Sequence, residues 1–305
     1  MKIFKVNEND EGQRLNRFIE KVFNCLPKSL MYKSIRKKNI KLNGKKVLPS
    51  YILKKGDVVS AFGLDSFLKE NKNSVLNNSK NFKLDVVFED KNILVINKKE
   101  GIMSQPNSKI KNSLIDYVLK YLIEKKEYVA ENENSFTPAF CTRLDTNTKG
   151  LIIAGKNAQA LRNLNELNRM LKIKKTYYCI VEGIVEKDNE ILKGFWKKDF
   201  KKNKVKISSN FEEFSKEVVT KFYVLKRFSN KTALKIVIYG GKSHQIRAHM
   251  QTIGHPIVGD LKYGSKFKEQ LKLVCCGLKF NSKNSYLDYL DGKNIILKKY
   301  YFVFN

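Results

Sequence analysis

Apolar positions recur every three or four residues in some stretches of this chain and form unbroken runs in others. The first pattern predicts helices and the second predicts strands. Helices are expected over residues 14–23, in a short segment capped by Ser29, from Ser113 onward, over 158–168 and over 244–254. Strands are expected over 56–62, twice within 84–101, and over 151–156, 176–183, 233–238 and 300–304. Because long strand runs are interrupted by only a few helices, we expect an α+β fold with a central mixed or antiparallel sheet and flanking helices.

The predicted elements fall into three segments. Residues 1–63 form a small α/β module in which a hairpin over 39–47 turns at Asn43-Gly44. Residues 64–84 are rich in Asn and lack sustained periodicity, which is typical of a flexible tether. Residues 85–305 form the larger domain.

The charge of the chain favours a polyanionic partner. Lys and Arg total 60 against 30 acidic residues, giving a formal charge of +30. Nucleic acid is the first candidate for such a partner and an anionic membrane surface the second. The basic residues are mostly Lys, however, and this bias is also typical of an AT-rich genome. Part of the charge is therefore expected to lie on solvent-exposed side chains that bind no partner.

Several absences in the sequence narrow the class of protein. The first 14 residues contain no apolar core of signal-peptide length, and no run of about 18 apolar residues predicts a membrane span. The five Cys residues form no metal-spaced pairs, and all three His lie within 244–255, which disfavours a zinc site. We therefore expect a cytoplasmic protein with buried free thiols, and a monomer because no oligomer signal is evident.

The basic residues are concentrated in one part of the small module. Seven basic residues and no acid lie between positions 33 and 46. They are Lys33, Arg36, Lys37, Lys38, Lys41, Lys45 and Lys46. A helix and a hairpin that carry this charge on one side could follow a phosphate backbone. The alternative is a generic helical module with a solvated face.

Three motifs carry the candidate chemistry. Asp145 lies in RLDTNTKGL (143–151), Tyr177 in KKTYYCIVEG (174–183) and Arg247 in GGKSHQIRAHMQTIGHPIVGD (240–260). A carboxylate, an aromatic face and a guanidinium on separate elements could form a pocket for a flat base on a charged backbone.

Two other motifs in these segments are rejected. Gly241-Lys242-Ser243 matches the end of a phosphate-binding P-loop, but the glycine required at position 236 is Ile. An aspartyl-phosphate enzyme places its Asp after an apolar strand, whereas Asp145 follows Thr142, Arg143 and Leu144.

The order and spacing of the three motifs resemble the RluA-type family of pseudouridine synthases, over almost the whole chain. The Thr142 form of the first motif is closest to the branch that acts on large-subunit ribosomal RNA. The small module resembles an RNA-binding module of a small-subunit ribosomal protein. This resemblance implies an RNA-modifying isomerase with the pseudouridine synthase fold, needing no metal, nucleotide or redox cofactor.

The resemblance also implies a role for each motif residue. Asp145 is the nucleophile, attacking either the anomeric carbon or the uracil ring. Tyr177 stacks on the uracil, and Arg247 pairs with Asp145 and keeps it ionised. Arg143 contacts the RNA backbone or fills the gap left by the extruded uridine. His244 and His249 are expected to make structural hydrogen bonds or RNA contacts rather than to act as acid-base catalysts.

Four positions depart from the family pattern. Many members have His at position 142, Ser at 149, Arg at 242 and Pro at 99, where this chain has Thr142, Lys149, Lys242 and Lys99. These differences bear on RNA selection more than on catalysis. Two alternatives stay open: a catalytically inactive RNA-binding or ribosome-assembly factor on the same fold, and a tRNA-directed synthase. The basic stretch 197–206 is either an RNA contact or a solvated hairpin.

Overall fold

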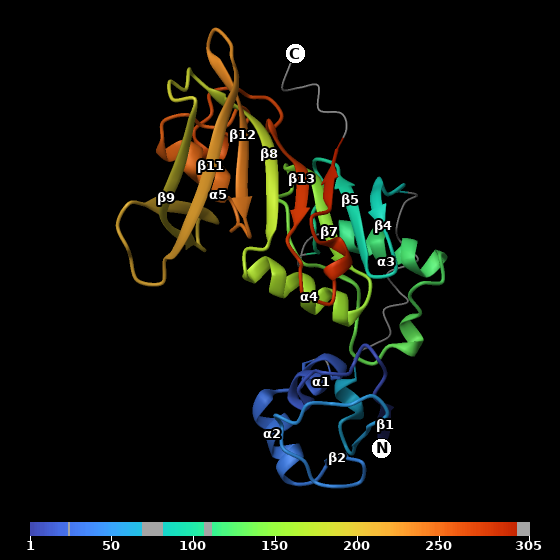
Figure 1. Ribbon diagram of the computed structural model, residues 1–305. Coiled ribbons are helices and arrows are strands. Elements are labelled where there is room, and N and C mark those ends of the chain that lie inside the picture. Colours follow the sequence, from blue (N-terminus) through green and yellow to red (C-terminus); the bar gives the residue numbers. More distant parts are fainter. Residues whose placement is uncertain (24, 69–81, 107–111, 298–305) are drawn as a thin grey trace. The chain divides into compact units, whose positions relative to one another are not determined.

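The computed structural model describes residues 1–23, 25–68, 82–106 and 112–297, which divide into two compact units (Figure 1). Unit 1 comprises residues 1–82, 116–139 and 156–159, and unit 2 comprises the remainder of the chain. Within the described ranges, no helix is both long enough and apolar enough to cross a membrane.

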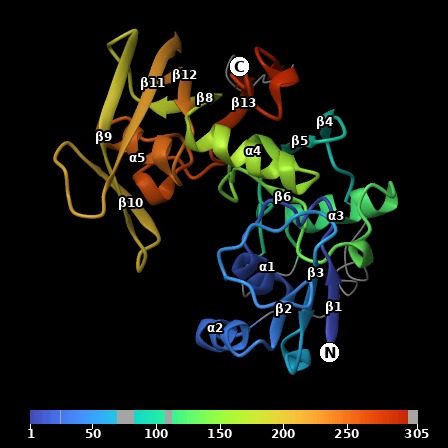
Figure 2. The same ribbon diagram turned by 60° about the horizontal axis from the view of Figure 1, so that its bottom comes forward.

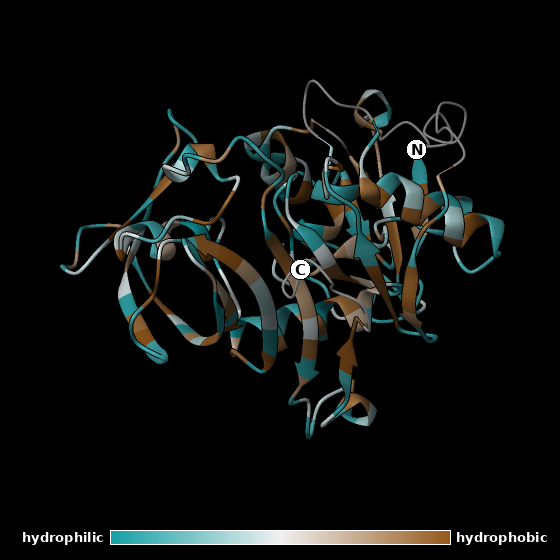
Figure 3. Ribbon diagram, turned by 90° about the horizontal axis from the view of Figure 1, so that it is seen from above, coloured by the Kyte–Doolittle hydropathy of each residue, from teal (hydrophilic) through white to brown (hydrophobic). Residues whose placement is uncertain are grey.

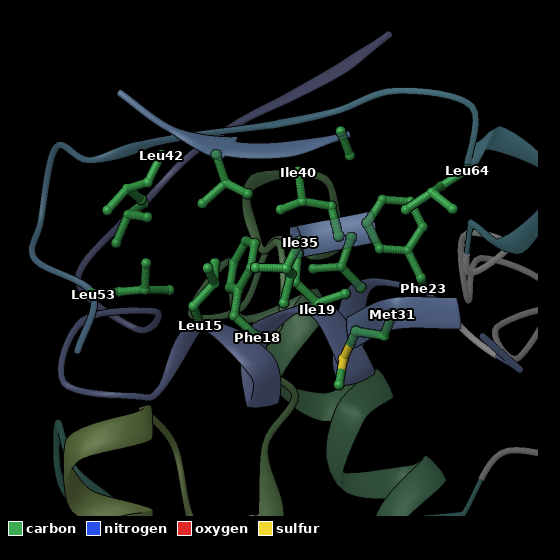
Figure 4. Close-up of a cluster of buried hydrophobic side chains, with 14 residues drawn as sticks. Leu15, Phe18, Ile19, Phe23, Met31, Ile35, Ile40, Leu42, Leu53 and Leu64 are labelled. Atoms are coloured by element: carbon green, nitrogen blue, oxygen red, sulfur yellow. The ribbon is translucent and has the colours of Figure 1, made fainter. Parts of the chain in front are cut away.

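Unit 1 is built on a three-stranded antiparallel sheet of order β1-β3-β2, formed by Lys2–Lys5, Val58–Ala61 and Ile40–Leu42. Helices α1 (Leu15–Val22) and α2 (Lys28–Arg36) supply the other side of its core. The apolar residues at helical spacing in the predicted helix 14–23 are all buried in α1, which confirms that pattern; they are Leu15, Phe18, Ile19 and Val22. Figure 4 shows the α1 side chains meeting those of β2 in one cluster.

Two local predictions for unit 1 turned out differently. Helix α2 begins at Lys28 after Pro27, and no side chain caps it. Ser29 therefore lies inside the first turn, and the prediction that it caps the helix is wrong; the extended backbone of Pro27 leads directly into the helix. The turn at Asn43-Gly44 is confirmed, because both residues have positive φ, +49° and +73°. Its hairpin, however, is limited to a bridge between Leu42 and Lys45, since β2 pairs with β3 instead.

The predicted tether is only partly within the described chain. Leu64 is buried in the core of unit 1, and a short 3-10 helix, η1 (Asp65–Phe67), follows it. Residues 69–81 and the predicted strand 300–304 lie outside the described residues.

Unit 2 is built around a mixed sheet of 11 strands, with the main order β10-β9-β11-β12-β8-β13-β7-β5-β4 (Figure 1). Among the strands within the described residues, only β13 and β7 pair in parallel, so the predicted mixed sheet of an α+β fold is confirmed. The strands are β4 (Val86–Glu89), β5 (Ile93–Lys98), β6 (Ala139–Phe140), β7 (Lys149–Gly155), β8 (Ile173–Glu182), β9 (Asn189–Asp199), β10 (Lys204–Ser208), β11 (Lys216–Arg227), β12 (Lys231–Tyr239), β13 (Leu273–Phe280) and β14 (Asn294–Ile296). Figure 3 shows long hydrophobic stretches along these strands, consistent with a buried sheet interior.

The remaining helices connect these strands. They are α3 (Leu114–Glu124), α4 (Ala158–Arg169), α5 (Gln245–Thr252) and the 3-10 helices η3 (Ala130–Asn132), η4 (Leu261–Tyr263) and η5 (Asp288–Leu290). Both α3 and α4 have residues in each unit. The rotated view in Figure 2 shows α5 on one side of β11 and β12. Helix α5 contacts β10 and β11.

Two packing features fix the elements that carry the motifs. Gly150, in β7, has φ +111°, and a Cβ there would lie 2.1 Å from the carbonyl oxygen of Cys275 in β13. Only glycine permits this close approach of the two strands. On the other side, Gln245 and His249 of α5 both hydrogen-bond to the hydroxyl of Thr220 in β11, at 3.0 and 2.7 Å. These bonds fix the orientation of α5, and with it the opposite face of the helix, which carries Arg247.

Candidate active site

A pocket of about 630 Å³ opens in unit 2 where the three motifs converge. Its lining comes from residues 103–106, 140–148, 238–247, strand β8 and the β9–β10 hairpin. Arg143, Asp145, Tyr177 and Arg247 all line it. The structure therefore brings together four residues that lie up to 104 positions apart in the sequence, from Arg143 to Arg247.

Asp145 lies in the turn that precedes β7, and several buried groups hold that turn. The Thr148 amide donates to the Asp145 carbonyl at 3.0 Å. The buried Ser104 hydroxyl donates to the Leu144 carbonyl at 2.8 Å. The fully buried Lys98 ammonium donates to the carbonyl of Thr146 at 2.8 Å. The carboxylate, with 24% of its side chain exposed, is consequently presented to the pocket on a fixed backbone.

Burial changes the pKa of the Lys98 ammonium group. Its pKa is lowered to about 8 by burial, against which the negative charges of Asp145 and Glu100 act. Lys98 thus adds positive potential close to Asp145 that weakens as the pH rises through 8.

Arg247 bridges two carboxylates. Its Nη1 donates to Oδ2 of Asp145 at 2.8 Å, while Nε and Nη2 donate to the two oxygens of Asp260 at 2.7 and 2.8 Å. The Asp260 side chain is only 1% exposed and that of Arg247 12%. Burial opposes the charge on Arg247, but the bonds and charges of Asp260 and Asp145 outweigh it and raise the pKa of Arg247. Asp260 therefore anchors the guanidinium, whose free edge holds Asp145.

Tyr177 reaches the pocket from the middle of β8, between Ile236 of β12 and Cys275 of β13. Its side chain is 7% exposed. Burial, together with Cys275 and Asp145, raises the pKa of its phenol well above the ordinary value, so the ring is neutral. Tyr178 alternates to the other face of the strand. A neutral aromatic ring in the pocket wall can stack on a planar base.

The other predicted RNA contacts lie at accessible positions. Arg143 is exposed at the pocket. The seven basic residues of the small module all belong to unit 1, on α2, β2 and their adjoining turns, and all are exposed except the half-buried Lys41. Of the 197–206 stretch, Lys198 and Asn203 line the pocket, and the stretch forms the β9–β10 hairpin.

Two of the positions at which this chain departs from the family pattern also make contacts at the site. Lys149 forms an ion pair with Glu100 at 3.3 Å. Lys242 lines the pocket in the loop before α5, where the indole of Trp196 donates to the Ser243 carbonyl at 2.9 Å. The Gly241-Lys242-Ser243 segment thus serves as pocket wall.

Sequence reasoning missed four residues that organise the site. They are Lys98, Ser104, Asp260 and Tyr263. The Tyr263 ring lies 4.9 Å from the guanidinium carbon of Arg247 and is fully buried. Asp260 ends the third motif, yet nothing in its sequence context shows that it is buried against Arg247.

Models of known families match both parts of the chain. The RNA pseudouridylate synthase model matches residues 92–252, and the S4 domain model matches residues 13–59. An RNA pseudouridine synthase of Mycoplasma capricolum, described as uncharacterized, is 32% identical over 299 residues and covers 96% of either chain.

Relatives with a named target are similar over most of the chain. Ribosomal large subunit pseudouridine synthase C of Buchnera aphidicola is 34% identical over 266 residues, covering 86% of this chain and 80% of the relative. The protein of the same name from Haemophilus influenzae is 30% identical over 280 residues, covering 89% and 82%. The solved structure of human RNA pseudouridylate synthase domain containing 1 has a TM-score of 0.57 at 17% identity, covering 73% of this chain and 86% of that one, which shows a shared fold.

Proposed function

Because this chain belongs to the RNA pseudouridylate synthase family, we propose that it modifies uridines of large-subunit ribosomal RNA and that Asp145 is its nucleophile. The chain is an RNA pseudouridine synthase, an isomerase with an RNA substrate. The ribosomal target is supported by the names of the relatives from Buchnera and Haemophilus. The proposed setting is the cytoplasm, with a monomer as the working form.

The reaction sets the requirements for the pocket. The bond from uracil N1 to ribose breaks, and the ribose is rejoined through C5 of the same base. A proton leaves C5 and a proton ends on N1, so atoms and electrons balance without a cosubstrate. Side chains are proposed to supply all the chemistry. The detached base must be retained, and water must be kept from the sugar, which a confined pocket achieves.

Asp145 fits the part of the nucleophile. It is proposed to attack the anomeric carbon or the uracil ring, and either route needs an ionised carboxylate in a fixed orientation. The 2.8 Å bond from Arg247 supports this role, because it fixes the orientation of the carboxylate and pairs it with a positive charge. Tyr177 is proposed to stack on the uracil and retain it while it turns.

The substrate must be extruded from folded RNA before it can enter such a pocket. Flipping a nucleotide costs a few kcal/mol, which contacts elsewhere must offset. Arg143 is proposed to contact the RNA backbone or fill the gap. The seven basic residues of unit 1 are proposed to bind phosphates, as the match to an S4 domain also supports.

The single observation that carries the nucleophile proposal is the chain of bonds from buried Asp260 through Arg247 to Asp145. The test is tritium release from RNA labelled at uracil C5, measured on unmodified ribosomal RNA and on bulk tRNA. Wild type is expected to release tritium from large-subunit ribosomal RNA, and Asp145→Asn is expected to bind this RNA without release. Asn still accepts a hydrogen bond from Arg247, so the variant should fold.

Asp188→Asn is the matched control. Asp188 also accepts a bond from an arginine, Arg227, at 2.7 Å, but does not line the pocket. This control should release tritium at the wild-type rate. Full turnover by Asp145→Asn would show that the nucleophile assignment is wrong. Release from tRNA alone would favour the tRNA-directed alternative, and tight binding with no release from any RNA would favour an assembly factor.

A further inference from the structure

His244 occupies a position in the pocket that neither its motif nor the proposed function explains. It immediately precedes α5 and has a left-handed backbone, with φ +54° and ψ +13°. Its side chain is 13% exposed and lines the pocket. The Nε2 atom lies 3.6 Å from Oδ2 of Asp145, which is longer than a hydrogen bond. The imidazole edge therefore faces the same space as the carboxylate without being bonded to it.

The other ring nitrogen is held by Tyr263. The hydroxyl of Tyr263 lies 2.9 Å from Nδ1 of His244, and it also accepts the backbone N–H of Val205 at 2.8 Å. The Val205 amide can only donate, so it provides no acceptor for the phenolic proton. Tyr263 is fully buried, and a buried O–H without an acceptor is strongly disfavoured.

These constraints fix the tautomer of His244. Burial raises the pKa of Tyr263 to about 12, so the phenol keeps its proton at neutral pH. Nδ1 of His244 is the acceptor that the geometry offers. A neutral imidazole that accepts at Nδ1 carries its proton on Nε2, the nitrogen that faces Asp145 and the pocket.

The surroundings also keep the ring neutral. Burial lowers the pKa of His244, and the positive charges of Arg247 and Lys262 act in the same direction, against Asp145 and Asp260. The pocket thus contains a neutral N–H donor beside the carboxylate of Asp145. A neutral donor can stabilise a developing negative charge without giving up its proton.

We propose that His244 is a catalytic residue whose Nε2–H donates a hydrogen bond to a carbonyl oxygen of the uracil, and that Tyr263 is the positioning residue that fixes this tautomer. The inference rests on the proposed nucleophilic role of Asp145. Attack at the anomeric carbon expels uracil with the electron pair of its N1 bond, and attack on the ring also places charge on a carbonyl oxygen. In both routes the donor binds that charge. His244 neither accepts the proton lost from C5 nor supplies the proton gained by N1; other groups exchange these protons.

The first experiment uses side chains of different length at position 244 to distinguish a hydrogen-bond donor from a purely structural residue. In Gln the amide nitrogen can reach the place of Nε2, whereas in Asn it reaches only the place of Nδ1. The left-handed backbone at position 244 favours Asn over Gln. A purely structural role would therefore be served better by His244→Asn, and a donor role by His244→Gln.

Single-turnover rates and RNA affinities are measured for both variants and for His244→Ala. The rate is expected to fall about 100- to 1000-fold in the Ala and Asn variants, as for loss of one preorganised donor. The Gln variant is expected to stay within about tenfold of wild type, and RNA affinity to stay within about twofold throughout. Equal rates for Asn and Gln, or a loss confined to affinity, would overturn the proposal.

The second experiment tests Tyr263 through a double-mutant cycle. Tyr263→Phe removes only the hydroxyl and is expected to slow the wild-type reaction about tenfold with unchanged RNA affinity. In the His244→Gln background the same change should have little effect, because Gln has no tautomer to fix. Equal slowing in both backgrounds would overturn the positioning role. Tyr128→Phe is the control, since Tyr128 is also buried and donates to the Phe136 carbonyl at 3.2 Å within unit 1. Its rate should match wild type.

Asp145→Asn is assayed alongside these variants. Full activity in Asp145→Asn would overturn the proposed nucleophile. Loss of activity there together with full activity in His244→Ala would overturn the role of His244 alone.

Discussion

Positive charge is organised in opposite ways in the two units. The seven basic residues at 33–46 of unit 1 are exposed or half-buried, and among the described residues none of them forms an ion pair with an acid. In unit 2, the Arg247 guanidinium is almost buried and uses three of its nitrogens to hold two carboxylates. The first arrangement suits a mobile polyanion, and the second fixes one carboxylate in one orientation.

The difference determines how each set responds to change. Exposed charges act through a screened field, so their effects are small, roughly additive and sensitive to salt. A buried pair has already lost its hydration, so removing one member leaves the other without compensation. Substitutions of the buried charges of unit 2 should therefore affect folding or turnover, and substitutions of the seven basic residues of unit 1 should affect RNA affinity.

The largest effect is expected from Asp260→Asn. The substitution leaves the buried Arg247 with a neutral partner on the side where it now has two charge-assisted bonds. Breaking a buried pair costs about 3–5 kcal/mol, which urea unfolding can measure. Asp188→Asn at the exposed pair with Arg227 should cost at most about 1 kcal/mol. Equal losses would show that burial does not distinguish these two pairs.

The next largest effect is expected from Arg247→Lys, which should slow turnover. A lysine carries the charge, but it cannot bind both oxygens of Asp260 and reach Asp145 as well. We expect the single-turnover rate to fall at least about 100-fold, with RNA affinity nearly unchanged. In the control Arg227→Lys, an arginine that binds the Val185 and Glu186 carbonyls away from the pocket is replaced, and the rate should be unaffected. A loss of RNA affinity in Arg247→Lys would instead indicate a direct RNA contact.

Much of the fold could be predicted because local pattern determines it. The helices carrying Leu15 and Leu164 and the strands around Glu89–Asn92 have apolar spacings that fit only one kind of element. The pairing of β2 with β3 could not be predicted, since it depends on contacts between residues about 20 positions apart. Strand β9 was also missed, apart from its end in the hairpin alternative for 197–206, because most of its side chains are exposed or half-buried and its pattern is correspondingly polar.

The candidate site shows the same limit. The meeting of Asp145, Tyr177 and Arg247 could be predicted from motif order, and all three line one pocket. The partners that hold them could not. Asp260 and Tyr263 lie beyond the end of α5 in the sequence and meet Arg247 only in the folded chain, and the burial that makes those contacts strong is a property of the fold.

A third prediction concerns the pH dependence of stability. His249 is 2% exposed, and burial lowers its pKa to about 4 from an ordinary 6.5. The unfolded chain therefore binds a proton at this residue before the folded chain does. Its contribution is fully present above pH 6.5 and is lost as the pH falls from 6.5 towards 4.

Between pH 7.5 and 5 this loss amounts to about 2 kcal/mol. His249→Gln, whose side chain does not titrate, should remove about that much of the pH dependence measured by urea unfolding. His249 lies in α5 of unit 2, so comparing wild type with this variant measures how much of the acid sensitivity arises at this residue. An unchanged pH profile in His249→Gln would show that another group is responsible.

The most salt-dependent effect is expected from Lys45→Ala combined with Lys46→Ala. Each phosphate contact releases about 0.7–0.9 counterions, so the slope of log affinity against log salt should fall by about 1.4–1.8. At 0.1 M salt the affinity should drop about 30-fold, with the rate on saturating RNA unchanged. Lys55→Ala is the control, because the charge of Lys55 is already compensated by Glu8 in the same unit. If the double variant changes affinity without changing the salt slope, these lysines do not bind phosphate, and the contrast between a screened surface and a fixed pocket fails for unit 1.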